Sequence, residues 1–502
     1  MKKYDLCVIG GGPAGYAAAM RALDFGKKTI LIEKNRLGGA AVFNGALSSK
    51  TLWEISTEYF EFRNFAENRL IQSGTASTGL SGKLKPDFDW ILKSMNDTLN
   101  TKEKQLMKQV EALEMMKGDN FSFINGKGEL EDRNTIKITT EDGATEIIQA
   151  ENIVLATGSR PRVLNNIPVD EKIICTSNGI HSMSGFPKSI VIVGAGVIGC
   201  EFATILGNFG CTRVNLIDKE DRILPFEDDD VAEVVIKNFE ELGVNIHHNA
   251  SLDKLDILNG KVSYSLKYKD DSRQTFEVEK ALLSIGRVPN IEGLGLEKAG
   301  IKCKSGGHIE DNDTQTSVPN IYAVGDLTAD IALVNVGELE GRHAVEKIYG
   351  NKIKPLSYSN ISTIMFLNPE IAAVGMNEKQ ARAAGLSYRV ACYHYSYISR
   401  ALAKRNTNGF FKILVSDDDQ MKVLGMRALG MHSSSAMAAV SLLISTNGGI
   451  ELLTELIQPH PSIPEGIQEC VRMLKHSSVL KPEVFKTGMR CTRVVNGVTV
   501  EY

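Results

Sequence analysis

The stretch Leu6-Cys7-Val8-Ile9-Gly10-Gly11-Gly12-Pro13-Ala14-Gly15 decides the fold of the first part of the chain. It reads as a short apolar strand that runs directly into a glycine-rich turn, and the Ala-rich segment 16–25 that follows is expected to form a helix. A second strand, 29–32, ends in Glu33. A strand, a glycine turn and a helix, with a carboxylate about 20 residues further on, predict a βαβ unit of the dinucleotide-binding type.

The glycines of this turn have separate roles in holding a dinucleotide. Gly10 permits the tight turn, Gly12 lets the backbone approach a pyrophosphate, and Gly15 allows the helix to pack closely on the strand. The N-terminus of the helix stabilises the phosphate charge, and the carboxylate after the second strand can accept hydrogen bonds from a ribose diol. The residues expected to hold the first dinucleotide are therefore Gly10, Gly12, Pro13, Ala14, Gly15 and Glu33.

The same unit recurs near the middle of the chain. An expected strand at 189–193 leads into the turn Gly194-Ala195-Gly196-Val197-Ile198-Gly199, a helix at 201–209, and a strand at 214–217 that ends in Asp218. A single glycine turn is weak evidence, since such turns also occur without a ligand. Two complete βαβ contexts, each with its acidic residue in place, predict two dinucleotide sites.

Asp218 indicates which nicotinamide nucleotide the second unit takes. Its carboxylate suits the free ribose 2′-OH of NADH and would repel the 2′-phosphate of NADPH. Three basic residues close in sequence, Arg213, Lys219 and Arg222, would partly offset that repulsion, although a solvated basic face is the simpler reading of them. We expect NADH, with NADPH left open, and the residues expected to hold it are Gly194, Gly196, Gly199, Asp218 and Gly286.

The composition is that of an ordinary globular protein. The 502 residues suggest about three or four domains, with 43% hydrophobic and 24% charged residues. The net charge of −4 favours neither nucleic acid nor an anionic membrane surface, and no apolar run approaches the roughly 18 residues that span a bilayer. No Cys/His group has zinc spacing, so we expect no metal site. We expect a cytoplasmic protein with mostly buried cysteines, which are Cys7, Cys175, Cys200, Cys211, Cys303, Cys392, Cys470 and Cys491.

Between the two glycine units the pattern predicts one long helix and a set of strands. A Gly/Ser-rich loop at 72–85 precedes a helix at 88–117, and short strands follow within 121–148, with a turn at 141–143. Three further apolar strands end in glycine turns, at Thr157-Gly158, at Gly286 and at Gly325-Asp326.

The order of these segments resembles a known family. Along the chain come the first glycine unit, the segment 38–50, the Thr157-Gly158 turn, the second glycine unit, the turn at 285–290, and Val324-Gly325-Asp326. This order is similar to that of the pyridine nucleotide-disulfide oxidoreductases, the family that includes lipoamide dehydrogenase, glutathione reductase and mercuric reductase. The resemblance covers roughly residues 4–476.

The resemblance implies two nested, doubly wound α/β domains and a C-terminal α+β dimerisation domain in a homodimer. An FAD domain is expected from residues 1–158 and 287–357, with an NAD(P) domain at 159–286 inserted into it. The dimerisation domain is expected at 358–476, and residues 477–502 form a tail without a counterpart in the family.

The resemblance also implies roles for residues of separate motifs. Thr157 and Gly158 would pass close to FAD, and Asp326 would bond its ribityl chain. Lys50 and Glu201 match a family ion pair beside the reactive edge of the flavin. His460 and Glu465 match the family's proton-handling pair, in which the histidine acts at the active site of the partner subunit. Here Pro464 departs from the usual serine, which puts the placement of Glu465 in question, because proline lacks a backbone donor.

The segment Gly38-Gly39-Ala40-Ala41-Val42-Phe43-Asn44-Gly45-Ala46-Leu47-Ser48-Ser49-Lys50 departs from the family where its two redox cysteines stand. Alanine occupies both places, Ala41 and Ala46, and cannot form a thiolate or a mixed disulfide. Ser48 replaces the family's proline, and Phe43 and Leu47 are also unusual. Such drift favours natural loss of the cysteines, while an engineered Cys-to-Ala variant of a disulfide reductase stays open.

We therefore expect an FAD-dependent NAD(P)H oxidoreductase without the redox disulfide. Electrons would pass from the flavin directly to a small-molecule acceptor, such as a quinone or a second nicotinamide. The alternative is a non-catalytic FAD- and NAD(H)-binding sensor or structural protein. Retention of Lys50, Glu201, His460 and Glu465 argues against it, because a scaffold needs none of them.

Overall fold

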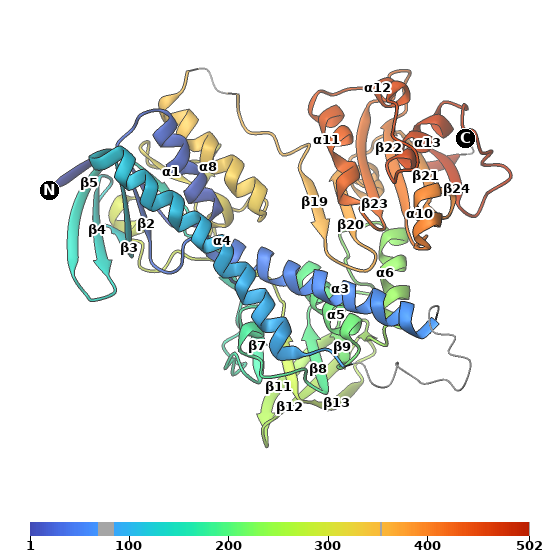
Figure 1. The fold of residues 1–502 in the computed structure, drawn as a ribbon, viewed down its shortest axis with the longest axis horizontal. Coiled ribbons are helices and arrows are strands. Elements are labelled where there is room, and N and C mark those ends of the chain that lie inside the picture. Colours follow the sequence, from blue (N-terminus) through green and yellow to red (C-terminus); the bar gives the residue numbers. More distant parts are fainter. Residues whose placement is uncertain (69–84, 352–353, 501–502) are drawn as a thin grey trace.

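The structure, a computed structural model, describes residues 1–68, 85–351 and 354–500 and arranges them in three domains (Figure 1). An N-terminal and an inserted domain are each built on a largely parallel sheet, and a C-terminal domain on an antiparallel one. Helix α4 (Phe88–Lys117) begins beside the inserted domain and ends on the N-terminal domain, and α3 (Ala46–Asn68) lies between the inserted and C-terminal domains. The Gly/Ser-rich loop expected at 72–85 falls almost entirely outside the described residues.

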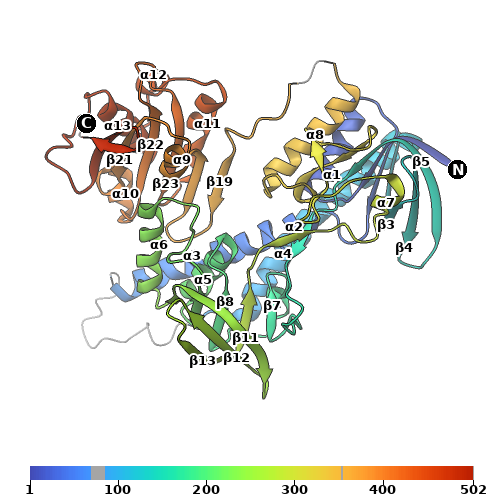
Figure 2. The same ribbon diagram turned by 180° about the vertical axis from the view of Figure 1, so that it is seen from behind.

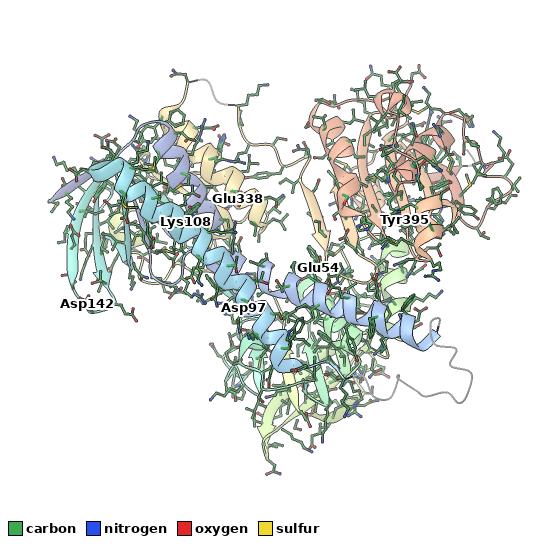
Figure 3. All side chains as sticks on the ribbon, in the orientation of Figure 1. Glu54, Asp97, Lys108, Asp142, Glu338 and Tyr395 are labelled. Carbon is green, nitrogen blue, oxygen red and sulfur yellow. The ribbon has the colours of Figure 1, made fainter. Side chains whose placement is uncertain are left out.

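The N-terminal sheet is doubly wound. Its parallel strands lie in the order β3-β2-β1-β5-β18, and β4 completes an antiparallel meander between β3 and β5. Figure 3 places Asp142 at the tip of the β4–β5 hairpin, away from the inserted domain. The strands of this sheet are β1 (Lys2–Ile9), β2 (Thr29–Glu33), β3 (Phe121–Leu130), β4 (Thr135–Thr140), β5 (Thr145–Leu155), β16 (Asp311–Asn312), β17 (Gln315–Thr316) and β18 (Ile321–Ala323).

Small residues let two helices pack closely on one face of this sheet. Helix α1 (Pro13–Asp24) is Ala-rich, and it lies beside α8 (Val334–Tyr349) in both views (Figures 1 and 2). A Cβ at Gly341 of α8 would lie 2.1 Å from the carbonyl oxygen of Ala14, so only glycine permits this approach. The close contact holds the start of α1 against α8 and the turn at Gly325.

The inserted domain repeats the same winding. Its parallel strands lie in the order β10-β9-β8-β14-β7, and a three-stranded antiparallel sheet packs beside them. The chain enters through β6 (Ser159–Pro161) and returns through β15 (Arg287–Pro289), which pair antiparallel. That pairing supports the boundaries at 158/159 and 286/287, which stay a prediction. The remaining elements are β7 (Ile174–Thr176), β8 (Ser189–Val193), α5 (Val197–Phe209), β9 (Arg213–Ile217), α6 (Asp229–Glu241), β10 (Asn245–His247), β11 (Ala250–Leu258), β12 (Lys261–Tyr268), β13 (Arg273–Val278) and β14 (Lys280–Leu283).

The C-terminal domain is a seven-stranded antiparallel sheet in the order β19-β20-β23-β22-β21-β24-β25. The chain beyond residue 476 was expected to form a tail, but β24 within it pairs with β21 along six residues of each strand. An unpaired edge of β21 would leave backbone groups without partners, and β24 satisfies them. The elements are β19 (Ser362–Met365), β20 (Ile371–Gly375), α9 (Glu378–Ala383), β21 (Tyr388–His394), α10 (Ser399–Lys404), β22 (Phe410–Ser416), β23 (Val423–Leu429), α11 (Met437–Ser445), α12 (Glu451–Glu455), α13 (Glu465–Leu474), β24 (Met489–Val495) and β25 (Val498–Val500).

The predicted fold class, two doubly wound α/β domains with an α+β C-terminal domain, is confirmed. The long helix expected at 88–117 has those bounds, with Asp87 capping its first turn by accepting from the backbone N–H of Trp90. The two helices after the glycine turns begin earlier than expected, at Pro13 and Val197. Proline favours the first helical position, because its fixed φ already suits the helix.

Candidate active site

The first glycine turn forms a backbone cradle at the N-terminus of α1. Gly10 has φ +113°, and a Cβ there would lie 2.3 Å from the carbonyl oxygen of Ala156. A Cβ at Gly15 would lie 1.9 Å from the carbonyl oxygen of Gly10. At Gly12, by contrast, a Cβ would meet no heavy atom of the described residues within 4 Å. The turn is therefore closed on the protein side and open at Gly12, which fits the approach of a pyrophosphate.

Glu33 is held firmly beneath this turn. One carboxylate oxygen accepts from the backbone N–H of Gly11 at 2.6 Å, and the other accepts from that of Asn35 at 2.8 Å. The residue is 8% exposed. These bonds fix the carboxylate beside the glycine turn, and its contact with a ribose stays a prediction.

Two further turns clasp each other at the junction of the N-terminal and inserted domains. The Thr157 hydroxyl donates to the carbonyl oxygen of Asn290 at 2.7 Å, and the Asn290 amide donates to that of Thr157 at 2.9 Å. The backbone N–H of Asn290 also donates to the carbonyl oxygen of Gly158. Asp326 accepts from the Ser159 hydroxyl at 2.5 Å. The structure thus gathers the expected flavin-side residues Thr157, Gly158 and Asp326 around one junction.

The second glycine turn repeats the geometry of the first. A Cβ at Gly199 would lie 1.9 Å from the carbonyl oxygen of Gly194, and one at Gly194 would lie 2.7 Å from that of Ser284. At Gly196 a Cβ would meet no atom within 4 Å in the part of the chain that the structure describes. Like the first turn, this one is closed on the protein side, at Gly194 and Gly199, and open at Gly196, at the N-terminus of the 13-residue helix α5. Gly286, expected at the same site, has φ +100°.

Asp218 lies at the end of β9 with half of its carboxylate unused. Its Oδ1 accepts from the backbone N–H of Glu220 at 3.1 Å, while its buried Oδ2 has no hydrogen-bond partner among the described residues. The residue is 4% exposed, and burial raises the pKa of its carboxyl group to about 6. A buried acceptor without a donor is costly, so a ligand hydroxyl would relieve it. This is the feature expected for a ribose diol.

An ion pair joins α3 to α5. Lys50 Nζ lies 2.7 Å from Glu201 Oε2, and the backbone N–H of Phe366 donates to Glu201 Oε1 at 3.1 Å. The side chain of Glu201 is 5% exposed and that of Lys50 is 27% exposed. The Lys50 ammonium also lies over the Phe366 ring, 4.9 Å from its centre. The two residues come from separate motifs, and the structure brings them together as expected.

The segment with the two alanines precedes this pair. Helix α2 (Gly39–Val42) contains Ala41, and α3 begins at Ala46, and both alanine side chains are half-buried. Phe43 lies between them, and its ring packs under the Arg36 guanidinium, 3.9 Å from the ring centre. Arg36 is in turn paired with Glu103 of α4. One face of the Phe43 ring is therefore occupied by the Arg36 guanidinium.

The expected acid–base pair forms within the C-terminal domain. His460 Nδ1 lies 2.7 Å from Glu465 Oε1, and Glu465 Oε2 accepts from the backbone N–H of Ser462 at 2.7 Å. Pro464 precedes α13 and does not prevent this arrangement. The His460 side chain is 69% exposed. Helix α13 lies well apart from the start of α3 in both views (Figures 1 and 2), so this pair and the Lys50–Glu201 pair are separate within one chain.

Sequence reasoning missed one buried carboxylate near the flavin-side junction. Glu340 of α8 is 1% exposed, and it accepts from the backbone N–H of Gly325 at 2.6 Å and from the Tyr358 hydroxyl at 2.9 Å. Burial raises the pKa of this carboxyl group to about 7. Glu340 supports the turn that carries Asp326. A glutamate on the face of a helix that also bears Gly337 and Gly341 was the available signal.

In residues 1–68, 85–351 and 354–500, no group of three or more His, Cys, Asp or Glu side chains is placed to hold a metal ion. Over the same ranges, no helix combines the length and the apolar character needed to cross a membrane.

Comparison with known proteins places this geometry in a family. The family model for pyridine nucleotide-disulphide oxidoreductases matches residues 4–341, and the model for the dimerisation domain of the same family matches residues 361–471. The second match supports the expected homodimer.

Curated relatives and solved structures agree with these matches. The dihydrolipoyl dehydrogenase of Bacillus subtilis is 31% identical over 93% of this chain and 97% of its own length. That of Chlorobaculum tepidum is 32% identical over 93% and 96%, respectively. The crystal structure of LpdA from Mycobacterium tuberculosis superimposes with a TM-score of 0.84 at 27% identity, covering 94% of this chain and 100% of that one. The chain therefore belongs to the pyridine nucleotide-disulphide oxidoreductases, flavoenzymes that use FAD and NAD(H), and it is an FAD-dependent oxidoreductase.

Proposed function

We propose that this oxidoreductase takes electrons from NADH and passes them through FAD directly to a small-molecule acceptor, without a redox disulfide. The acceptor is a quinone, a second nicotinamide or a comparable molecule. One observation carries the proposal: the Lys50–Glu201 pair is intact at 2.7 Å, whereas the adjoining segment bears Ala41 and Ala46 where the family's cysteines are expected. The machinery for loading electrons is retained and the thiols for unloading them are missing.

The residues of this chain have distinct tasks in that reaction. FAD, when bound, supplies a two-electron carrier between NADH and the acceptor. Lys50 holds a positive charge that favours electron-rich states nearby, and Glu201 fixes its direction. His460 exchanges a proton through Nε2, while Glu465 orients the ring through Nδ1. Neither alanine supplies a nucleophile, so no step passes through a thiolate.

NADH is the proposed donor because of Asp218. The Oδ2 of Asp218, which has no partner within the described part of the chain, is suited to accept from a ribose 2′-OH, and a 2′-phosphate would meet a buried negative charge instead. The cytoplasmic location expected from the sequence also stays a prediction.

Anaerobic titration of the FAD-loaded protein with NADH tests the proposal. We expect one NADH per FAD to bleach the flavin absorbance completely, with no long-wavelength thiolate–flavin band. A protein with a redox disulfide would need a second equivalent, because the first pair of electrons would end on the sulfurs. A two-equivalent titration, or a thiolate–flavin band, would contradict the proposal. Failure of both NADH and NADPH to bleach the flavin would favour the sensor or structural role instead.

A matched variant sharpens this test. Ala41→Cys combined with Ala46→Cys restores both sulfurs, and we expect it to require the second equivalent of NADH. The relatives are dihydrolipoyl dehydrogenases, so dihydrolipoamide is the substrate with which to compare the two proteins. We expect the unaltered chain to reduce NAD⁺ with dihydrolipoamide far more slowly than the double variant. Equal rates would show that the two alanines do not occupy the positions of the redox cysteines.

A further inference from the structure

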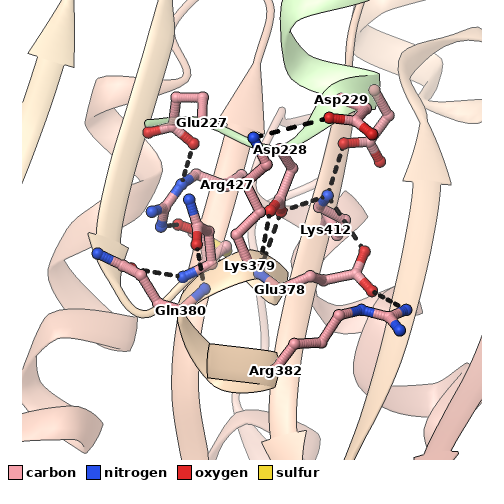
Figure 4. A network of polar contacts seen from close by, with 12 residues as sticks. Glu227, Asp228, Asp229, Glu378, Lys379, Gln380, Arg382, Lys412 and Arg427 are labelled. Carbon is pink, nitrogen blue, oxygen red and sulfur yellow. Dashed lines mark hydrogen bonds and ion pairs between the residues drawn. The ribbon is translucent and has the colours of Figure 1, made fainter. Parts of the chain in front are cut away.

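A buried network of charges joins the inserted domain to the C-terminal domain (Figure 4). Its centre is Lys412 of β22, which is 0% exposed. The ammonium lies 2.7 Å from Asp228 and 2.6 Å from Asp230, both at the start of α6, and 3.3 Å from Glu378 of α9. In Figure 4 the side chains of Asp228, at the start of α6, and Glu378 of α9 approach Lys412 from two different elements.

A second pair lies beside the first. Arg427 of β23 donates through Nε to Glu227 at 2.7 Å, and both side chains are 5% exposed. Asp228 also accepts from the backbone N–H groups of Glu378 and Lys379, at the first turn of α9. The acidic segment 227–230 is thus tied to β22, β23 and α9 of the C-terminal domain.

Such a network fixes geometry more than it adds stability. Burial by itself lowers the pKa of the Lys412 ammonium, but the facing carboxylates outweigh that effect, and its pKa lies above the usual value. Buried ion pairs recover little beyond the cost of removing their charges from water. They do impose one relative position on the elements that carry them, because any displacement leaves a charge buried without its partner.

Two backbone hydrogen bonds connect the acidic segment 227–230 to the glycine turn 194–199 of the inserted domain. The backbone N–H of Glu227 donates to the carbonyl oxygen of Leu224 at 2.9 Å, and the backbone N–H of Leu224 donates to that of Ala195 at 3.2 Å. Ala195 lies in the turn between Gly194 and Gly196. Leu224 is 0% exposed and has φ +49°, a left-handed conformation that a bulky residue keeps only when its surroundings impose it.

We propose that Lys412 and Arg427 are positioning residues for the NAD(H) site. They hold the acidic segment, and through Leu224 they hold the glycine turn 194–199, at one place relative to the C-terminal domain. Strand β22, which carries Lys412, also contacts α13, because a Cβ at Gly466 of that helix would lie 2.6 Å from the ring of Phe411. Strand β22 thereby links the nicotinamide turn on one side to the helix that begins with Glu465 on the other.

Binding of NAD⁺ to the oxidised, FAD-loaded protein tests this inference. In Lys412→Met we expect the Kd for NAD⁺, measured by isothermal titration calorimetry, to rise about tenfold. The KM for NADH should rise in parallel, while kcat at saturating NADH changes less than about twofold. The matched control is Arg490→Gln, because Arg490 reaches Asp230 at 3.5 Å from an exposed position, and it should leave the Kd unchanged. Asp228→Asn, which keeps the size of the side chain, carries the same test should Lys412→Met fail to accumulate.

The outcomes separate this inference from the assignment on which it rests. An unchanged Kd in Lys412→Met or Asp228→Asn, with only a lower unfolding temperature, would overturn it, because the network would then merely join two domains. A fall in kcat with an unchanged KM would overturn it as well. Failure of the unaltered protein to bind NAD⁺ would instead contradict the NAD(H) site and the proposed function.

Discussion

Replacing Lys50 by methionine should have a larger effect than neutralising its partner. Methionine preserves much of the apolar stem of lysine and removes the charge, which leaves the Glu201 carboxylate, with a side chain only 5% exposed, without its counter-ion. The reverse change, Glu201→Gln, leaves Lys50, whose side chain is 27% exposed and can turn its ammonium into water. The structure therefore predicts an asymmetric response from two ends of one ion pair.

The magnitudes follow from the distance and the burial. Two unit charges 2.7 Å apart attract by ~6 kcal/mol at an effective dielectric constant of about 20, and desolvation of the pair offsets most of this energy. Removing one partner of a buried pair costs about 3–5 kcal/mol, and the partial exposure of Lys50 puts Lys50→Met near ~3 kcal/mol. Glu201→Gln should cost only ~1 kcal/mol. Combining both changes should cost little more than Glu201→Gln alone, because no unpaired charge is left behind.

Tryptophan fluorescence offers a local assay. The chain has two tryptophans, and Trp53 lies on α3 with its ring packed edge-on against Phe366 at 5.2 Å. The backbone N–H of Phe366 binds Glu201, so Trp53 reports on the elements that carry the pair. In a Trp90→Phe background, which removes the exposed second tryptophan, urea unfolding should rank Lys50→Met as the least stable variant. The reasoning would be refuted if Glu201→Gln were equally or more destabilising, since burial of the carboxylate would then not control the response.

Three further predictions concern other buried or paired groups. The pKa of the Asp218 carboxyl group is raised to about 6, so its contribution to stability is present near pH 4 and is lost as the pH rises through about 6. Between about pH 4 and about pH 7, the free energy of unfolding of Asp218→Asn should therefore rise by up to ~3 kcal/mol relative to that of the unaltered protein. Urea unfolding without nucleotide measures this difference, and a difference that does not change with pH would count against the prediction. With an acceptor that takes up protons, Glu465→Gln should slow turnover about tenfold and His460→Gln about 10²-fold. Neither change should alter the rate at which NADH bleaches the flavin in a stopped-flow experiment. A slower bleaching step would contradict the proposed proton-transfer role of this pair. Tyr358→Phe removes the hydroxyl that donates to the Glu340 carboxylate, whose pKa is raised to about 7. The variant should therefore be destabilised by ~1–3 kcal/mol above about pH 8, where the carboxylate is charged, and by less below about pH 6. Thermal unfolding measures this loss, and a loss that does not depend on pH would argue against the hydrogen bond.

Local signals explain why much of the fold could be read from the sequence. The glycine turns at Gly10 and Gly194 have positive φ and leave no space for a side chain, which restricts these positions to glycine. Helix α4 carries its own start signal in Asp87 and its own stop signal in Gly118. Such features depend on neighbours within one turn, so a single sequence reveals them.

The two candidate site pairs were predicted by resemblance and not by local physics. Lys50 and Glu201 stand 151 positions apart, and only the matching of separate family motifs connected them. The placement of Glu465 after Pro464 was in question, and the structure answers it through bonds to His460 and to the backbone of Ser462. The role of each residue in catalysis stays a prediction.

The sequence by itself determined the winding of the two nucleotide domains and the family, because glycine turns and hydrophobic periodicity depend on neighbouring residues, and the assignment of Ala41 and Ala46 to the places of the family's cysteines stays a prediction. Only the tertiary structure decided which charged residues are buried together. Lys412 meets Asp230 across 182 positions and Arg427 meets Glu227 across 200, and an isolated lysine or arginine in a strand gives no sign of such a partner. The position of β24, within the expected tail, likewise depends on its pairing with the edge of β21. Burial and pairing depend on chain closure over long distances, and no local pattern encodes them.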